Sequence, residues 1–228
     1  IPDFGLGWRA LFPIYAAVCL LSLLALGATR IEEERPEGAS GVGDCVRLLS
    51  DPFVLLCFLG ILCHVGIDVG TNTTAPKLLM ERAALSLEEA GLATSVYFLL
   101  RTGGCFVGTF LLRRLPARVF FLSSIGLMVV AMGVLLFAGS PAVLYAGIGL
   151  VGLANSNVFS VIFSQALNHL PAKKNEVSGL MIMGLFGGTL FPLAMGYASD
   201  GLGSQAGAVA VMLAGAAYLL FYGLKICS

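Results

Sequence analysis

The feature that most constrains this sequence is a series of long apolar stretches that fills most of its 228 residues. A transmembrane helix needs about 20 predominantly apolar residues, whereas the strands of a membrane β-barrel are about 10 residues long and alternate in polarity. The sequence therefore predicts an all-α polytopic membrane protein with about seven transmembrane helices. The predicted spans are roughly Leu11–Ala28, Pro52–Ala75, Glu89–Leu112, Val119–Ala138, Pro141–Asn168, Val177–Ser199 and Gly207–Leu224.

Composition excludes several other classes of protein. Hydrophobic residues make up 58% of the chain and charged residues only 11%, whereas soluble domains carry about 25% charged residues. The 13 basic residues are balanced by 13 acidic ones, so there is no basic field that would bind nucleic acid. The six cysteines form no CxxC pair, and Walker A, HExxH and GxSxG motifs are absent from the sequence. We therefore expect no metal site, no cofactor and no enzymatic activity.

Basic residues in the connections predict the orientation. Arg113, Arg114 and Arg118 lie between the third and fourth spans, and Lys173 and Lys174 lie between the fifth and sixth. The positive-inside rule makes these connections cytoplasmic, which predicts an external N-terminus and an external connection at Lys77–Leu87. We expect a multi-pass protein of the cytoplasmic (inner) membrane, with the lipid bilayer as its surroundings. The acidic, glycine-containing segment Thr29–Asp51 is interpreted as a solvated cytoplasmic linker between one helix and a six-helix bundle.

The last six spans resemble two triplets of helices. The first helix of each triplet has a polar middle, at Gly66–Asn72 and Gly152–Asn157, and the second carries a glycine pair, Gly103-Gly104 or Gly187-Gly188. Matching features in corresponding helices are typical of transporters built from inverted repeats, whose site lies near the middle of the membrane. Glycine-rich spans also occur wherever membrane helices pack closely, so the pattern fits both explanations.

Two charged residues lie inside predicted spans, Asp68 in the second and Arg101 in the third. A charge in the bilayer costs about 2.5–3.5 kcal/mol on insertion scales, so such residues usually pair or face a water-filled path. We expect both side chains to face the interior, where an extended arginine could reach the aspartate. The pair could couple or gate transport beside a solute cavity, or it could serve only to hold two helices together.

Uncharged polar residues extend this candidate site. His64, Asp68 and Asn72 recur every four residues and therefore share one helix face, which offers hydrogen-bond donors and acceptors suited to a hydroxyl-rich ligand. Asn155 and Asn157 lie near the middle of the fifth span and are further candidates for solute contacts. The same residues could instead form a hydrogen-bonding seam between helices.

These residues also carry a family resemblance. Gln165–Gly203 resembles helices ten and eleven of the sugar transporters of the major facilitator superfamily, a group that includes a fucose–proton symporter and bacterial glucose/galactose transporters. Val65–Val69 resembles the Val-Gly-Ala-Glu-Val of that family's helix seven, with Asp68 in place of the acid, and Gly108–Arg114 resembles its loop between helices eight and nine. The matching positions in the first of these stretches are Ser178, Gly179, Gly187, Gly188, Pro192, Gly196, Ser199 and Asp200.

The sequence also departs from that family. An arginine is expected at Cys105 but stands one turn earlier, at Arg101, and the acid of the loop motif is replaced by Leu112. The family has twelve helices, so the resemblance implies a fragment: residues 1–28 as the last helix of the N-terminal half, 29–51 as the central linker and 52–228 as the C-terminal bundle of two inverted repeats. The residues of the missing N-terminal half, the expected partner of this chain, have no counterpart here.

The resemblance implies a secondary transporter that moves a monosaccharide by alternating access, with proton symport. A carrier of the same fold for a non-sugar solute, such as an organic anion or a drug, is the alternative, and an exposed Arg101 in the cavity would favour an anion. A seven-helix receptor or an intramembrane enzyme is a third possibility, against which the triplet repeat and the lack of a nucleophile–base motif argue.

Overall fold

The computed structural model describes residues 8–29 and 41–225, and it divides the chain into two compact units at residue 39. The first unit contains the helix α1 (Leu11–Ala28), which follows a short 3₁₀ turn at Trp8–Ala10. None of its 18 residues is buried. The apolar side chains of α1 are thus available to lipid or to another protein surface. About half of the predicted linker, residues 30–40, lies outside the described residues.

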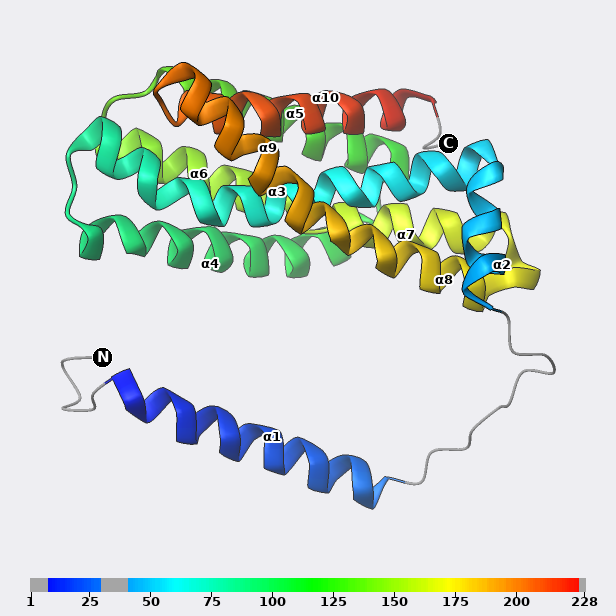
Figure 1. The fold of residues 1–228 in the computed structure, drawn as a ribbon. Coiled ribbons are helices and arrows are strands. Elements are labelled where there is room, and N and C mark those ends of the chain that lie inside the picture. The colour runs from blue at the N-terminus through cyan, green and yellow to red at the C-terminus, as the bar shows by residue number, and fades with distance from the viewer. Residues whose placement is uncertain (1–7, 30–40, 226–228) are drawn as a thin grey trace. The chain divides into compact units, whose positions relative to one another are not determined.

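The second unit is a bundle in which successive membrane-spanning segments run antiparallel to one another (Figure 1). Among the described residues, seven helical segments are long and apolar enough to cross a membrane, α1 included. This count confirms the predicted all-α membrane fold. The helices of the bundle are α2 (Val42–Arg47), α3 (Pro52–Ala83), α4 (Leu87–Leu111), α5 (Ala117–Phe137), α6 (Pro141–Asn155), α7 (Val158–His169), α8 (Lys174–Met183), α9 (Gly187–Leu202) and α10 (Ala206–Lys225).

The end of the predicted linker is helical rather than extended. The short helix α2 leads into a 3₁₀ turn at Leu48–Ser50, in which Leu48 is buried, and α2 packs against α8. Asp51 then begins α3 by accepting hydrogen bonds from the backbone N–H groups of Phe53 and Val54. This is the usual role of an aspartate before a helix that starts with proline.

Helix α3 is longer than predicted, and the connection expected at Lys77–Leu87 is correspondingly shorter. Its external position stays a prediction. The helix continues through Pro76 to Ala83, and the turn to α4 is confined to Ala84–Ser86, where Ala84 has a left-handed backbone with φ 51°. The charged residues in this last part of the helix suggested a loop. Two of them, Glu81 and Arg82, instead form hydrogen bonds with neighbouring elements at this end of the bundle.

Arg82 is the clearest case of such a satisfied charge. Its Nη1 donates hydrogen bonds to the carbonyl oxygens of Leu135, Leu136 and Ala138, at 2.9, 2.6 and 3.3 Å. These carbonyls belong to the C-terminal end of α5, where the helix dipole favours a positive charge. The positive-inside rule predicts that this end of the bundle is external, where basic residues are less common. The hydrogen bonds of Arg82 to α5 explain why a basic residue lies there nevertheless.

The polar middles of the two triplets differ in the structure. Helix α3 is continuous through Gly66–Asn72, and the side chains of Thr71 and Asn72 donate to carbonyls one turn back in the same helix. The fifth predicted span instead breaks into α6 and α7 at Ser156 and Asn157. The sixth changes from α8 to α9 through a 3₁₀ turn at Gly184–Phe186.

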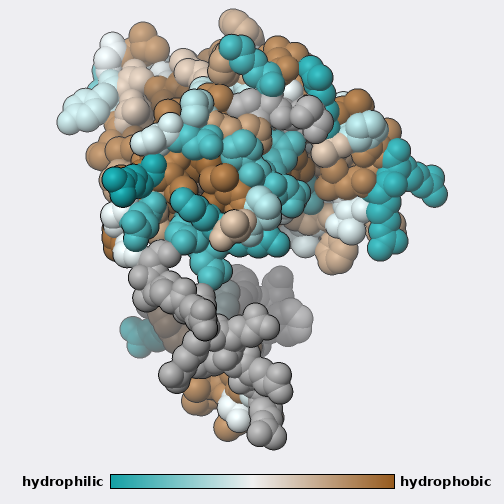
Figure 2. Space-filling model, turned by 90° about the vertical axis from the view of Figure 1, so that its right-hand side faces the viewer, coloured by the Kyte–Doolittle hydropathy of each residue, from teal (hydrophilic) through white to brown (hydrophobic). Residues whose placement is uncertain are grey.

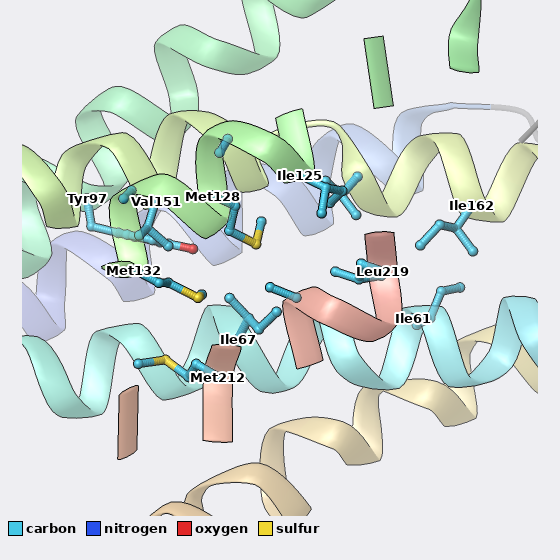
Figure 3. Close-up of a cluster of buried hydrophobic side chains, with 14 of the residues drawn as sticks. Ile61, Ile67, Tyr97, Ile125, Met128, Met132, Val151, Ile162, Met212 and Leu219 are labelled. Atoms are coloured by element: carbon cyan, nitrogen blue, oxygen red, sulfur yellow. The ribbon is translucent and has the colours of Figure 1, made fainter. Parts of the chain in front are cut away.

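The hydrophobic core lies along the axis of the bundle, where α4 packs on α6 and α10 packs on α3, α5 and α9. In Figure 3, Ile61 of α3, Ile162 of α7 and Leu219 of α10 point toward one another, and all three are fully buried. Met128, Met132 and Met212 fill another part of this core. The unbranched methionine side chain suits irregular gaps between helices.

Glycines set the closest contacts between helices. A Cβ atom on Gly104 of α4 would meet Ser156, and one on Gly187 of α9 would overlap the backbone carbonyl of Leu62 in α3. The other glycine of each pair is less restricted. A Cβ atom on Gly103 would have open space, and one on Gly188 would meet only side chains. One glycine in each pair therefore permits a close helix contact, as expected for small residues in membrane bundles.

Candidate functional site

The two intramembrane charges form an ion pair between α3 and α4. Arg101 Nη1 lies 2.8 Å from Asp68 Oδ2, and the side chains are 26% and 18% exposed respectively. The other carboxylate oxygen, Asp68 Oδ1, accepts a hydrogen bond from the hydroxyl of Tyr97. Tyr97 and Arg101 are four residues apart on α4, so both reach the carboxylate from one helix face. Both carboxylate oxygens are thus engaged by α4.

A third helix joins this network through Asn155, the last residue of α6. The Asn155 side-chain amide donates to the Tyr97 hydroxyl at 3.2 Å, and both residues are completely buried. Asp68, Arg101, Tyr97 and Asn155 together are called the polar network below. It connects α3, α4 and α6 at the point where α6 ends and the fifth span is interrupted.

Three buried polar atoms near this network make no close hydrogen bond within the described residues, although the side chains of His64 and Asn155 also interact with each other. They are His64 Nδ1, Asn72 Oδ1 and Asn155 Oδ1. Most buried polar atoms in proteins are paired, so an unpaired one requires an explanation. The amide oxygens can only accept hydrogen bonds, and a neutral imidazole carries one acceptor nitrogen. A rearrangement of the helices that exposes these atoms would let them accept hydrogen bonds from a ligand that carries hydroxyl groups.

The predicted residues of α3 occupy successive turns of the helix. His64 is 2% exposed and lies close to Phe159 of α7, with ring centroids 6.0 Å apart. Asn72 uses its amide N–H to reach the backbone carbonyl of Asp68 at 2.9 Å, which leaves its oxygen free. These two residues thus extend the polar network along α3 in both directions.

Asn157 has a different environment from Asn155. Its side-chain amide donates to the carbonyl of Gly104 in α4 at 2.9 Å and to Ser156 Oγ at 3.0 Å. A Cβ atom on Gly108 would overlap this amide. The structure therefore brings Asn157 against the α4 backbone, where it connects helices, and does not bring it into the polar network.

The sequence pointed to the two charges of the network and to Asn155, but not to Tyr97. The available signal was the four-residue spacing between Tyr97 and Arg101 in a membrane helix. Gln165 is hydrogen-bonded within the bundle, where it accepts from the Tyr222 hydroxyl at 2.8 Å. Within the described ranges, no three His, Cys, Asp or Glu side chains are grouped as a metal site requires.

At the end of the bundle that carries α2, Asp51 contacts His169 at the end of α7. Asp51 Oδ2 lies 3.1 Å from His169 Nε2, and the His169 ring stacks on Phe53 with centroids 4.2 Å apart. Burial acts to raise the pKa of Asp51, but the hydrogen bonds from His169, Val54 and Phe53 outweigh it and lower that pKa below its usual value. Asp51 therefore stays ionised at physiological pH and keeps α3 attached to α7.

Comparison with known proteins places this architecture in a family. Residues 4–192 match the Major Facilitator Superfamily. A glucose/galactose transporter of Brucella abortus is 26% identical over 174 residues, which cover 75% of this chain and 42% of the relative. A putative glucose/galactose transporter of Helicobacter pylori strain J99 is 27% identical over 222 residues, which cover 93% of this chain and 52% of the relative. The chain thus spans about half the length of these relatives.

Solved structures agree with this fold. A crystal structure of FucP, a Major Facilitator Superfamily transporter in the outward conformation, superposes with a TM-score of 0.81 at 19% identity, covering 95% of this chain and 54% of FucP. A bacterial homolog of the human lysosomal transporter Spinster, inward-facing and unoccupied, gives a TM-score of 0.52 at 17% identity, with 95% and 57% covered. The family match and these superpositions describe one transporter fold, and the chain belongs to the Major Facilitator Superfamily.

Proposed function

We propose that this chain is the C-terminal part of a twelve-helix secondary transporter that carries a monosaccharide across the cytoplasmic membrane. Residues 1–28 would supply the last helix of the N-terminal half, 29–51 the central connection and 52–228 the C-terminal bundle. In this arrangement the bundle rocks against the N-terminal half around a site near the middle of the membrane. The partners are therefore the sugar, a coupled proton, the bilayer and the N-terminal half.

The observation that carries the proposal is the set of unpaired acceptors around the polar network. Within the described residues, Asn72 Oδ1 and Asn155 Oδ1 are buried and make no close hydrogen bond, near the Asp68 carboxylate and the Tyr97 hydroxyl. A monosaccharide presents several hydroxyl groups that can each donate a hydrogen bond. Leaving a buried acceptor unpaired costs about 1–3 kcal/mol, so a ligand that satisfies these atoms gains that energy on binding.

The relatives support a sugar as the solute. Two proteins that align with most of this chain carry the name glucose/galactose transporter, one of them as a putative function. A second structure of the superposed protein describes it as the fucose:proton symporter of E. coli. We extend this substrate class and proton symport to the complete form of the present protein.

We assign sugar contacts to Asn72, Asn155 and His64, and a coupling or gating role to Asp68 and Arg101. The ion pair can separate only if another group replaces each partner, because an isolated charge in this environment is costly. Proton binding to Asp68 or sugar binding beside it would weaken the link between α3 and α4. Asn157 remains a proposed contact residue, although its amide nitrogen already binds Gly104.

An organic anion is less well supported than a sugar. An anion carrier needs a positive charge that is available to the solute. The guanidinium of Arg101 lies 2.8 Å from a carboxylate, which already neutralises its charge. The network as a whole therefore favours a neutral, hydroxyl-rich solute.

The test is uptake of radiolabelled monosaccharides by the complete protein in liposomes, with and without an inward proton gradient. Glucose, galactose and fucose form the panel, and a radiolabelled organic anion such as lactate is the comparison. We expect saturable uptake of at least one sugar that rises with the gradient and falls when an ionophore collapses it. Uptake of the anion alone would replace the sugar proposal, and gradient-independent sugar uptake would remove proton symport from it.

A further inference from the structure

The further candidate site is an apolar groove at the ends of α4 and α5 near their connection. The groove has a volume of about 220 Å³ and is lined by residues of α4, α5 and the end of α6. Its apolar lining includes Phe120 and Leu127 of α5, Val107 and Leu111 of α4, and Leu153 of α6. Only small polar side chains, Ser123, Ser124 and Ser156, interrupt this apolar lining. Its shape and chemistry suit a hydrocarbon chain.

A cluster of arginines lies in the connection between α4 and α5, next to residues that line this groove. Arg113 and Arg114 lie between two lining residues, Leu111 and Leu115, and Arg118 precedes the lining residue Phe120. All three are exposed, and neither Arg113 nor Arg114 has an ion-pair or hydrogen-bond partner for its guanidinium in the described part of the chain. The sequence contains no aspartate or glutamate between Glu89 and Glu176. No acidic residue close in sequence balances the positive charge of Arg113 and Arg114.

The neighbouring helix α10 adds to this charge. Arg118 donates a hydrogen bond to the carbonyl of Leu224 at 3.1 Å, and the next residue, Lys225, lies over the ring of Phe221 at 5.1 Å. Figure 2 shows hydrophilic residues gathered at the end of the bundle that carries α2 and α8. Since α4, α7 and α10 all end on this side, the arginine cluster lies where apolar helices meet water.

Residues adjacent in sequence to the groove lining are apolar and exposed. Phe106 and Phe110 of α4 are 69% and 67% exposed, and Val119 of α5 is 48% exposed. Exposed apolar side chains of this size on a membrane helix are compatible with contact to lipid chains. The groove thus has apolar residues along it and positively charged residues at one end. This arrangement matches a phospholipid, whose acyl chains are apolar and whose headgroup phosphate is negatively charged.

We infer that the groove between α4 and α5 binds an anionic phospholipid, with an acyl chain between Val107 and Phe120 and the headgroup phosphate on Arg113 and Arg114. Arginine suits this role because its planar guanidinium can bind two phosphate oxygens at once. A neutral phospholipid would leave the net charge of the cluster uncompensated. The site is separate from the polar network and does not depend on which solute the protein carries.

Native mass spectrometry of the complete, detergent-purified protein tests this inference. The protein is titrated with phosphatidylglycerol and, separately, with phosphatidylcholine of the same chain length. We expect phosphatidylglycerol to bind more tightly, and the double variant Arg113→Gln/Arg114→Gln to lose roughly tenfold or more of that affinity, given the attraction of each basic residue for anionic lipid. Ser123→Leu, which fills the groove and leaves the arginines in place, should weaken binding similarly.

The matched control is Lys173→Gln/Lys174→Gln, which removes the same charge from the α7–α8 connection, away from the groove. Its phosphatidylglycerol affinity should stay within about twofold of the wild type. An equal loss in this control would mean that the lipid responds only to overall charge. Equal binding of both lipids, or wild-type affinity in the arginine or Ser123 variants, would overturn the inference. Size-exclusion profiles verify that each variant is folded, and Ser123 is exposed enough to accept the change.

Discussion

Replacing Arg101 with glutamine is expected to destabilise the protein by about 2 kcal/mol or more. The change leaves the Asp68 carboxylate with one partner, Tyr97, in a partly buried position. Removing one member of a fully buried ion pair costs about 3–5 kcal/mol. The expected cost of about 2 kcal/mol is below that range because 26% of the Arg101 side chain is exposed and solvent screens part of the charge. Thermal unfolding in detergent measures the effect.

A double-mutant cycle separates the pair from its surroundings. Asp68→Asn alone leaves the arginine without its counter-charge, whereas Asp68→Asn combined with Arg101→Gln leaves two neutral groups that can still share a hydrogen bond. We expect the double variant to be more stable than Arg101→Gln alone. If the two single effects simply add, the ion pair contributes nothing specific and the network is not held together as described.

Gly187→Ala is expected to produce the second large effect. A Cβ atom at this position would overlap the backbone carbonyl of Leu62 and its neighbouring backbone atoms, which cannot rotate away as a side chain can. The α9 helix must then move off α3. Overpacking of this kind costs typically about 1–3 kcal/mol and sometimes more. We expect a lower unfolding temperature and a smaller yield of monodisperse protein.

Gly196→Ala is the matched control for this substitution. It lies in the same helix, and a Cβ atom there has nothing within 4 Å. Alanine is favoured over glycine inside a helix by up to about 1 kcal/mol, so this variant should be neutral or slightly stabilised. Equal destabilisation by both changes would show that α9 tolerates no side chain at either glycine, and that the contact with Leu62 is not the cause.

Hydropathy predicted the number of membrane helices because each must be apolar over about 20 residues whatever it packs against. It failed at the end of α3, where charges suggested a loop. There Arg82 binds carbonyls of α5, and Glu81 accepts hydrogen bonds from Ser204 Oγ at 2.6 Å and from the Gln205 N–H at 2.8 Å. These partners are 53 or more residues away in sequence, so no local pattern could reveal them.

The candidate site could be predicted only in part, because some of its contacts also depend on residues far apart in sequence. A charge inside an apolar stretch stands out, so the Asp68–Arg101 pair could be expected from sequence, and it forms in the structure. Tyr97 resembled an ordinary aromatic packing residue, because only tertiary contact distinguishes a hydroxyl that binds a carboxylate. The break between α6 and α7 was not predicted either. The polar middle of this span was visible in the sequence, but the contact of Asn157 with the Gly104 carbonyl across helices was not.

The central claim is that the complete protein carries a sugar through a site that includes the polar network. The most direct measurement compares initial rates of sugar uptake in liposomes for the wild type, Asp68→Asn and Glu88→Gln. Glu88 is exposed in the first turn of α4, outside the network, so its variant controls for loss of an acidic residue. The account predicts that Asp68→Asn loses roughly tenfold or more of the rate, equivalent to about 1.4 kcal/mol, while Glu88→Gln keeps it. Sugar uptake at the wild-type rate by a folded Asp68→Asn protein would contradict the account.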